Sequence, residues 1–164
     1  MIKPAVALLF AVVMIGGCSG HYSGAGLQPG RSSAQEVEAL MGPAAEQRPG
    51  PGGETLQYYP RLPYGQAMYV ARIGPDGKLV AIEQRLTPEN AAKVVPGRTS
   101  AGEVRDLLGP PWGAPRYARL ERDIWSYPMH VRSGYTKPQM FIVQLSYDGL
   151  VREAFFINDP EFDY

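Results

Sequence analysis

The sequence predicts an α+β fold, in which short helices pack on three-stranded antiparallel sheets in a tandem repeat of two units. Two observations support this prediction. Residues 29–43 recur at residues 96–110 without a gap, with ten of fifteen positions identical. Each copy is followed by alternating apolar and polar residues that end in Asp-Gly, a pattern typical of antiparallel hairpins. We therefore expect one unit to be present twice.

The N-terminus has the three parts of a secretory signal. Lys3 gives a basic tip, residues 5–15 form an unbroken apolar run, and two glycines precede Cys18, the single cysteine of the chain. The eleven apolar residues are fewer than the roughly 20 that a membrane-spanning helix needs. Residues 1–17 are therefore predicted to direct export and then to be removed.

The residues at the cleavage point resemble the lipobox of bacterial lipoproteins, Ile15-Gly16-Gly17-Cys18. The resemblance implies that the Cys18 thiol is acylated and becomes the N-terminus of the mature chain. An ordinary signal peptide with an incidental cysteine is the alternative. A lone cysteine also excludes intramolecular disulfides, so the domain must be held together by its apolar core.

Each fifteen-residue copy is predicted to form one short helix. Ser33 and Ser100 stand as N-caps, with Glu36 and Glu103 three residues later in the capping-box arrangement. Apolar residues recur behind them at i, i+3 and i+4, and Gly-Pro ends each helix. Two turns of helix are not stable alone, so each helix must pack on a sheet.

The expected strands lie downstream of each helix. A first strand ends in Tyr-Pro, and two more form a hairpin, which gives three strands in each unit. We expect a type I′ turn at both Asp-Gly pairs, because this turn needs positive φ at both central residues. Thr87 and Pro88 mark the start of a further helix. The predicted hairpin strands are residues 69–73 with 78–86 and residues 141–147 with 150–157.

These elements divide the chain into five predicted parts. Residues 1–17 are the signal peptide, and residues 18–28 are the lipidated cysteine and a glycine-rich flexible leash. The two units take residues 29–86 and 87–158, and residues 159–164 form an acidic tail. Alternating acidic residues could bind calcium, but no central glycine and distal glutamate complete a binding loop, so we expect a solvated tail.

Charge and residue types argue against several functions. Removal of Lys3 leaves 16 − 1 = 15 Lys and Arg against 16 Asp and Glu, so no basic surface favours nucleic acid. A hydrolase needs a nucleophile, a base and an orienting residue within reach of one another, and the candidate bases are few: His21 lies in the leash, and His130 is expected to be an exposed loop histidine, with a general base as the alternative. Neither has a Cys or His neighbour at metal-ligand spacing. We therefore expect no enzyme activity, no metal, no cofactor and no small-molecule substrate.

Aromatic residues are the candidate contacts with a protein partner, since Tyr and Trp offer a large contact area at low entropic cost. Tyr64, Trp112 and Tyr135 lie in predicted loops and are the candidate contact residues. The core is expected to take Tyr59, Trp125 and Tyr127.

Four short motifs within residues 86–157 carry a family resemblance. They are Leu86-Thr87-Pro88-Glu89, the helix copy at residues 97–110, Trp125-Ser126-Tyr127, and the hairpin at residues 145–151. Together they resemble the BamE/SmpA/OmlA family of outer-membrane lipoproteins. A weaker copy covers residues 29–86, so the whole is similar in architecture to the β-lactamase inhibitor proteins.

The resemblance implies a location on the periplasmic side of the bacterial outer membrane, where family members support the complex that folds β-barrel proteins. Ser19, and not aspartate, follows Cys18, which fits export to the outer membrane. We predict a non-catalytic lipoprotein, held in the membrane by the lipid on Cys18, that binds another envelope protein. The alternative is an inhibitor-like module that blocks an envelope or secreted enzyme.

Overall fold

A computed structural model describes residues 23–63, 65–129 and 138–160 of the 164-residue chain. Within these residues the architecture is α+β, as predicted, with two antiparallel four-stranded sheets. The strand orders are β1-β2-β3-β4 and β5-β6-β7-β8, so strands that are neighbours in the sequence are also neighbours in each sheet. The elements are α1 (Ala34–Met41), β1 (Glu46–Pro49), η1 (Pro51–Gly53), β2 (Thr55–Pro60), β3 (Met68–Ile73), β4 (Leu79–Gln84), α2 (Pro88–Ala91), α3 (Ala101–Leu108), β5 (Arg116–Tyr117), η2 (Ala118–Leu120), β6 (Arg122–Met129), β7 (Gln139–Ser146) and β8 (Val151–Asn158).

The helices α1 and α3 begin with the predicted capping boxes. The Ser33 N–H donates to the Glu36 carboxylate at 2.7 Å, and the Ser100 N–H donates to the Glu103 carboxylate at the same distance. Each serine hydroxyl in turn accepts a hydrogen bond from the glutamate backbone N–H. Both helices end at a glycine with φ of 86°, in a region that is essentially confined to glycine. The predicted helix boundaries are therefore confirmed.

Both Asp-Gly hairpins form, but the predicted type I′ turn is wrong. Gly77 and Gly149 have φ of 74° and 83°, whereas neither aspartate is among the residues with positive φ. The Asp76 carboxylate accepts a hydrogen bond from the backbone N–H two residues on at 3.1 Å, and Asp148 does the same at 3.0 Å. These bonds fit a type I turn followed by a glycine bulge, a hairpin connection that needs only one residue with positive φ.

Each sheet has one strand more than the predicted three. β1 pairs with β2 over four residues, and β5 pairs with β6 over two. Both extra strands follow a helix whose Gly-Pro end returns the chain along its sheet. The three-strand prediction was wrong because such short edge strands bury little and therefore lack alternating apolar residues.

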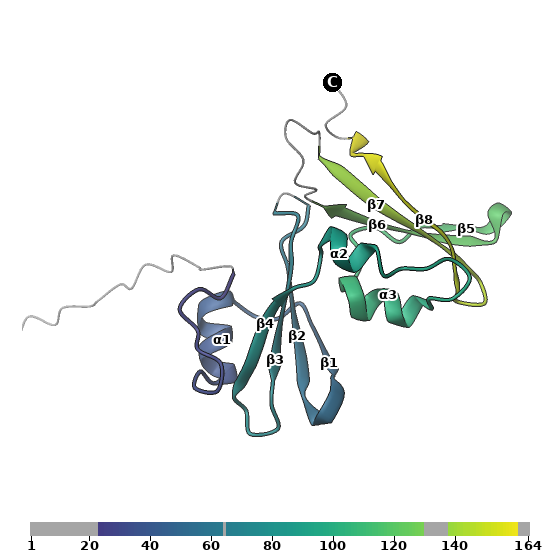
Figure 1. Cartoon of the computed structure of the whole chain (residues 1–164). Helices are drawn as coiled ribbons and strands as arrows, with labels where there is room; N and C mark the ends of the chain where they lie inside the picture. Colours follow the sequence, from purple (N-terminus) through teal and green to yellow (C-terminus); the bar gives the residue numbers. More distant parts are fainter. Residues whose placement is uncertain (1–22, 64, 130–137, 161–164) are drawn as a thin grey trace, which may run out of the picture.

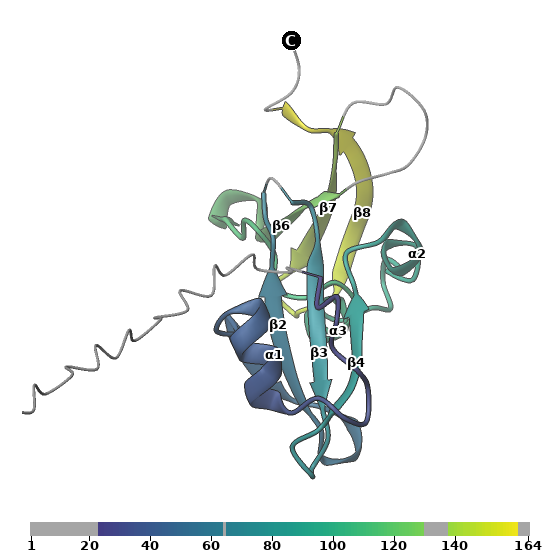
Figure 2. The same cartoon turned by 90° about the vertical axis from the view of Figure 1, so that its left-hand side faces the viewer.

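α1 covers one face of the first sheet (Figure 2). Val37 and Met41 of the helix belong to one buried cluster with Tyr59 and Leu79 of the sheet. The segment before α1 joins this cluster through Leu27. Gly24 is buried as well, and the Gly30 N–H donates to the Leu79 carbonyl at 2.7 Å. Gly24 and Leu27, which we had expected in the flexible leash, therefore belong to the packed structure.

α3 lies between the two sheets, so the layers run helix, sheet, helix, sheet (Figure 1). Val104 and Leu108 of this helix are fully buried. They belong to one cluster that takes side chains from α2, α3 and both sheets. That cluster consists of Leu56, Tyr58, Met68, Val70, Leu86, Ala91, Val94, Val104, Leu108, Tyr127, Met129, Phe141, Val143, Leu145 and Val151.

Ion pairs and a hydrogen bond at the edge of this core connect α3 to the first sheet. Arg105 Nη2 lies 2.9 Å from Glu46 Oε2, and Arg48 Nη1 lies 3.1 Å from Asp106 Oδ1. Arg85 Nη1 also donates to the Asp106 carbonyl at 2.6 Å. These groups are partly exposed, so the pairs orient α3 more than they stabilise it.

The acidic C-terminal segment begins in the folded domain. Asp159 was expected in a solvated tail, but it is only 3% exposed. Its backbone N–H donates to the Pro138 carbonyl at 2.8 Å, which continues the pairing between β7 and β8. The tail prediction was therefore wrong at Asp159, because the β8 ladder extends to this residue.

Candidate protein-binding face of the second sheet

The second sheet has one face that no helix in the described part of the chain covers (Figure 1). α3 packs on the face that carries Tyr127, Val143 and Leu145. Alternate residues of each strand point to the opposite face, which we call the open face. Its side chains are those of Arg122, Ile124, Ser126, Pro128, Met140, Ile142, Gln144, Ser146, Glu153, Phe155 and Ile157.

The cross-strand register divides the open face into an apolar half and a polar end. In the apolar half, Phe155 is 39% exposed and Ile157 is 37% exposed. Ile142 and Pro128 beside them are buried, so Phe155 and Ile157 are the accessible apolar side chains of this half. Exposed apolar side chains mark a contact surface, because they gain free energy when a partner removes them from water. The two rows of the apolar half are Ser126-Ile142-Phe155 and Pro128-Met140-Ile157.

The polar end of the open face is formed by Arg122, Gln144 and Glu153. Arg122 Nη1 donates a hydrogen bond to Gln144 Oε1. Arg122 also lies 3.9 Å from Glu153 Oε1, at the limit of an ion pair, and the Glu153 side chain is 52% exposed. The Glu153 carboxylate is therefore available to a basic or hydrogen-bonding group of a partner.

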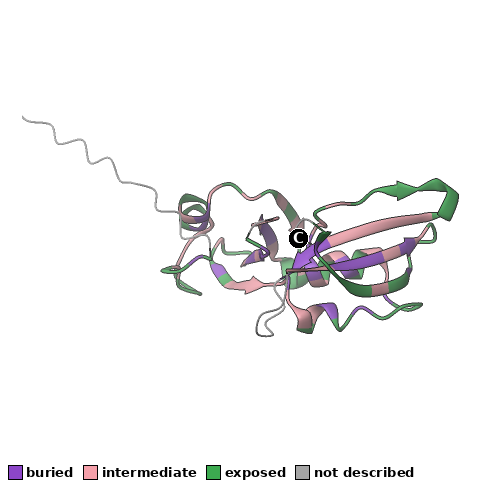
Figure 3. Cartoon of the chain, turned by 90° about the horizontal axis from the view of Figure 1, so that it is seen from above, coloured by how far each residue is buried: buried purple, intermediate pink, exposed green. Residues whose placement is uncertain are grey.

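The β5–β6 hairpin adds exposed aromatic residues beside the sheet, and it is mostly coloured as exposed in Figure 3. Arg116 holds the hairpin together, because its Nε and Nη2 atoms donate to the two Asp123 oxygens at 2.8 and 3.0 Å. These hydrogen bonds also lower the pKa of Asp123. The same guanidinium lies over the Tyr147 ring, 5.1 Å from its centroid. Tyr117 on β5 is exposed.

Of the predicted contact residues, the structure describes Trp112. Its side chain is 53% exposed, and its backbone N–H donates to the Ser126 carbonyl at 2.9 Å. Trp112 therefore lies at the β6 edge of the second sheet. Several predictions lie outside the described part of the chain: the signal peptide at residues 1–17, residues 161–164 of the tail, and the single residues Cys18, Ser19, His21, Tyr64, His130 and Tyr135.

Sequence reasoning missed Phe155 and Ile157 as candidate contacts. It placed them in strands but looked for contacts only among loop aromatics. The signal was present, since Phe155, Phe156 and Ile157 are consecutive and therefore put apolar side chains on both faces of β8. A strand that is apolar on both faces is normally covered on both faces.

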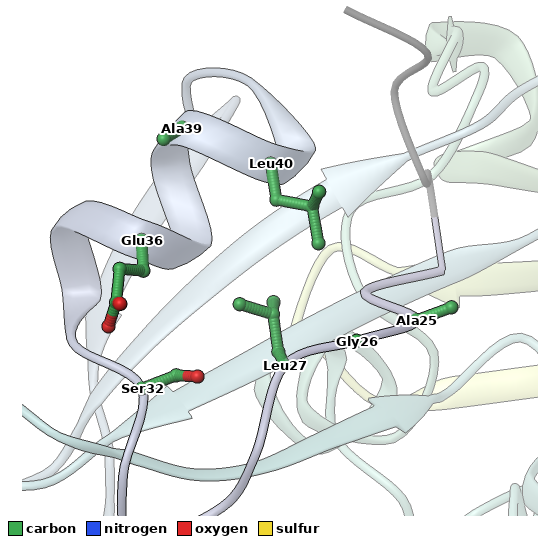
Figure 4. Close-up of a pocket in the computed structure, with 7 residues that line it drawn as sticks. All are labelled: Ala25, Gly26, Leu27, Ser32, Glu36, Ala39 and Leu40. Carbon is green, nitrogen blue, oxygen red and sulfur yellow. The ribbon is translucent and has the colours of Figure 1, made fainter.

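A hollow of about 380 Å³ opens between α1 and the segment before it (Figure 4). Leu27 and Leu40 point toward one another across it. Its titratable residue is Glu36, whose carboxylate is already bound to the N–H and hydroxyl of Ser33 at 2.7 and 3.1 Å. The hollow therefore lacks a free acid or base. It is lined by Ala25, Gly26, Leu27, Ser32, Glu36, Ala39 and Leu40.

The shifted pKa values have structural causes. Burial raises the pKa of Tyr127 and of Tyr59. A hydrogen bond from Arg72 lowers the pKa of Glu54. Within the described residues, no group of three or more His, Cys, Asp or Glu side chains could hold a metal ion. Among the described helices, none is long and apolar enough to cross a membrane.

No protein-family model matches this chain, and no curated protein matches it. Among solved structures, it is similar to a DUF4309 family protein, YjgB, from Bacillus subtilis, with 16% identity and a TM-score of 0.30 over 87% of this chain and 95% of the other. It is also similar to a protein from Streptococcus mutans that is described as a candidate β-lactamase inhibitor. That similarity has 16% identity and a TM-score of 0.32 over 77% of this chain and 82% of the other. At these TM-scores the similarities decide neither fold nor function, and the resemblance to the BamE/SmpA/OmlA family stays a prediction.

Proposed function

We propose that this chain is a non-catalytic lipoprotein of the bacterial cell envelope that binds another envelope protein through the second sheet. The open face carries the proposal. Its apolar half includes Phe155 and Ile157, which are more than one third exposed. Exposed Trp112 lies at the edge of the same sheet, and such aromatic residues are frequent anchors of protein interfaces.

The lipobox supports the location that we propose for this interaction. Acylation of Cys18 would hold the domain at the membrane surface, and Ser19 after the cysteine favours the outer membrane, on its periplasmic side. The resemblance to the BamE/SmpA/OmlA family suggests a link to the assembly of outer-membrane proteins. In this arrangement the membrane anchor and the binding face are separate parts of the molecule.

We also propose that the two units are copies of one ancestral unit. The Gly30 N–H donates to the Leu79 carbonyl and the Gly97 N–H donates to the Val151 carbonyl, both at 2.7 Å. The N-cap serines have the same backbone angles, φ of −84° and ψ of 162°. Two copies of a unit need not have the same role. The first sheet is covered on both faces, so the second unit supplies the binding surface.

A cross-linking pull-down from native membranes tests the proposed function. The full-length lipoprotein is compared with Cys18→Ala, which cannot be acylated. We expect an envelope protein to be recovered with the wild type and to be lost or strongly reduced with Cys18→Ala. Recovery of barrel-assembly components would place the chain in that machinery, and recovery of a single enzyme that the purified domain inhibits would favour the inhibitor-like alternative. Equal recovery with both forms would contradict the proposed anchor, and no recovery with either would contradict the binding role.

A further inference from the structure

The open face of the second sheet corresponds, row by row, to the face of the first sheet that α3 covers. The strand register gives the correspondence. Two successive residue pairs between β2 and β3 of the first sheet match two successive pairs between β6 and β7 of the second sheet. In both sheets the first of these pairs is a proline with a methionine. The matched pairs are Pro60 with Met68 and Pro128 with Met140 in one row, and Tyr58 with Val70 and Ser126 with Ile142 in the next.

In the first sheet, this face receives a helix. Met68 lies so close to the end of α3 that a Cβ atom at Gly109 would be 2.7 Å from Met68 Cγ. Tyr58 and Val70 are fully buried beneath the helix layer. The arrangement of side chains on this face is therefore one on which an α-helix packs, with a glycine at the point of closest approach.

We infer that the open face docks an amphipathic α-helix of the partner protein, in the position that α3 takes on the first sheet. The inference rests on the proposed function and adds the chemistry of the partner. Met140 stands in the place of Met68, so the partner helix carries glycine or another small residue there. Ser126 stands in the place of Tyr58, so a larger apolar side chain of the partner fills the space that a tyrosine occupies in the first sheet.

The edge of the open face also differs from the first sheet in charge. Val70 is paired with Glu83 on β4, whereas Ile142 is paired with Phe155 on β8. Glu83 belongs to an ion-pair cluster and accepts from Arg85 at 3.1 Å. The partner helix therefore presents apolar side chains at this edge, where α3 meets charged groups.

A second copy of this chain does not supply such a helix from its described residues. The side of α1 that faces away from its sheet carries exposed Gln35, Glu38 and Ala39, so it offers no apolar stripe. The apolar residues Val104 and Leu108 of α3 are already buried between the two sheets. The inference therefore commits to a helix of another protein as the occupant.

Site-specific photo-cross-linking in native membranes tests the inference. p-Benzoylphenylalanine is placed singly at Ser126, Phe155 or Ile157 of the full-length lipoprotein, and the cross-linked partner residues are identified by mass spectrometry. We expect them to come from one segment and to be spaced by three or four residues, which is the spacing of one helix face. Spacing by two would show a strand on the open face or at the β8 edge. That result would overturn the inference but leave the binding role intact, whereas no cross-link at any position would contradict both.

The effect of a substitution on partner binding tests the proposed helix position independently. Ser126→Tyr restores the side chain found at Tyr58 and fills the proposed helix position. We expect at least about tenfold weaker partner binding, with an unchanged circular dichroism spectrum. Val80→Tyr is the control for adding a tyrosine elsewhere, because Val80 is exposed and lies on β4 of the first sheet. Unchanged binding by Ser126→Tyr in a folded protein would overturn the inference.

Discussion

Met68 of β3 packs against Gly109 at the end of α3, where a Cβ atom would lie 2.7 Å from Met68 Cγ. The corresponding glycine of α1, Gly42, has nothing within 4 Å of the same point. Both glycines have φ of 86°. The two positions therefore differ in their neighbours and not in their backbone conformation, which makes them a matched pair.

Alanine at these two glycines should separate backbone strain from packing strain. We expect Gly42→Ala to lower the free energy of unfolding by about 1–3 kcal/mol, because a side chain is disfavoured at this φ. Gly109→Ala should cost about 1–3 kcal/mol more, because the methyl group must displace Met68. Urea unfolding of both variants measures the difference. Equal losses would contradict the close contact between α3 and the first sheet.

Removal of the hydroxyl group should affect the stability of the fold differently at two buried tyrosines. The Tyr58 hydroxyl is buried and has no hydrogen-bond partner, so Tyr58→Phe should leave the stability unchanged or raise it by up to about 1–3 kcal/mol. The Tyr127 hydroxyl donates to the Gly109 carbonyl at 3.2 Å, so Tyr127→Phe should cost about 0.5–1.5 kcal/mol. Thermal and urea unfolding give both values. A destabilised Tyr58→Phe would show that its hydroxyl is bonded.

The capping boxes should contribute to acid sensitivity. The backbone N–H and hydroxyl of Ser100 donate to Glu103 and lower its pKa in the folded protein below the unfolded value. A group of this kind stabilises the fold above its unfolded pKa and loses that contribution as the pH falls through its folded pKa. Glu103→Gln can keep the cap hydrogen bond but does not titrate. Its melting temperature should therefore fall less than that of the wild type as the pH is lowered below about 4.5.

Melting curves measured from pH 7 to pH 2 check this expectation. Glu36→Gln is the matched variant, because Glu36 has the same bonds to Ser33 and its pKa is lowered for the same reason. Parallel pH profiles for the wild type and both variants would show that these carboxylates do not contribute to the acid response.

The contact between α3 and the first sheet should depend on apolar burial more than on its ion pairs. Arg105 and Glu46 are 36% and 31% exposed, so a double-mutant cycle should give a coupling energy below about 1 kcal/mol. Leu108→Ala should cost about 2–5 kcal/mol, since Leu108 is fully buried. Urea unfolding of these variants measures both. A coupling energy larger than the Leu108 effect would reverse this ranking.

The sequence was sufficient to place the helices and hairpins, because their signals are local. Ser-x-x-Glu and Gly-Pro fixed the bounds of α1 and α3, and Asp-Gly fixed the two hairpins. The turn type was not predictable from Asp-Gly alone, since the aspartate side chain can bind the backbone and so favour a different turn. The short strands β1 and β5 have no local signal.

The position of α3 between two sheets and the existence of the open face could not be predicted from the sequence, because both depend on tertiary structure. Val37 and Met41 of α1 match Val104 and Leu108 of α3 in sequence, yet α1 has one sheet beside it and α3 has two. An apolar stripe shows that a helix is buried, but it does not show how many layers cover it. For the same reason, the apolar strand residue Phe155 could be assigned to a sheet but not to an uncovered face.

Partner capture with a single charge on the open face tests the central claim most directly. Ile157→Lys places an ammonium group in the apolar half, and Val80→Lys does the same on the first sheet at a similar exposure, 40% against 37%. Both full-length variants are cross-linked in native membranes and the partner is quantified. We expect Ile157→Lys to recover at most about one tenth of the partner that the wild type recovers, and Val80→Lys to match the wild type. Full recovery by Ile157→Lys would contradict a binding role of the open face.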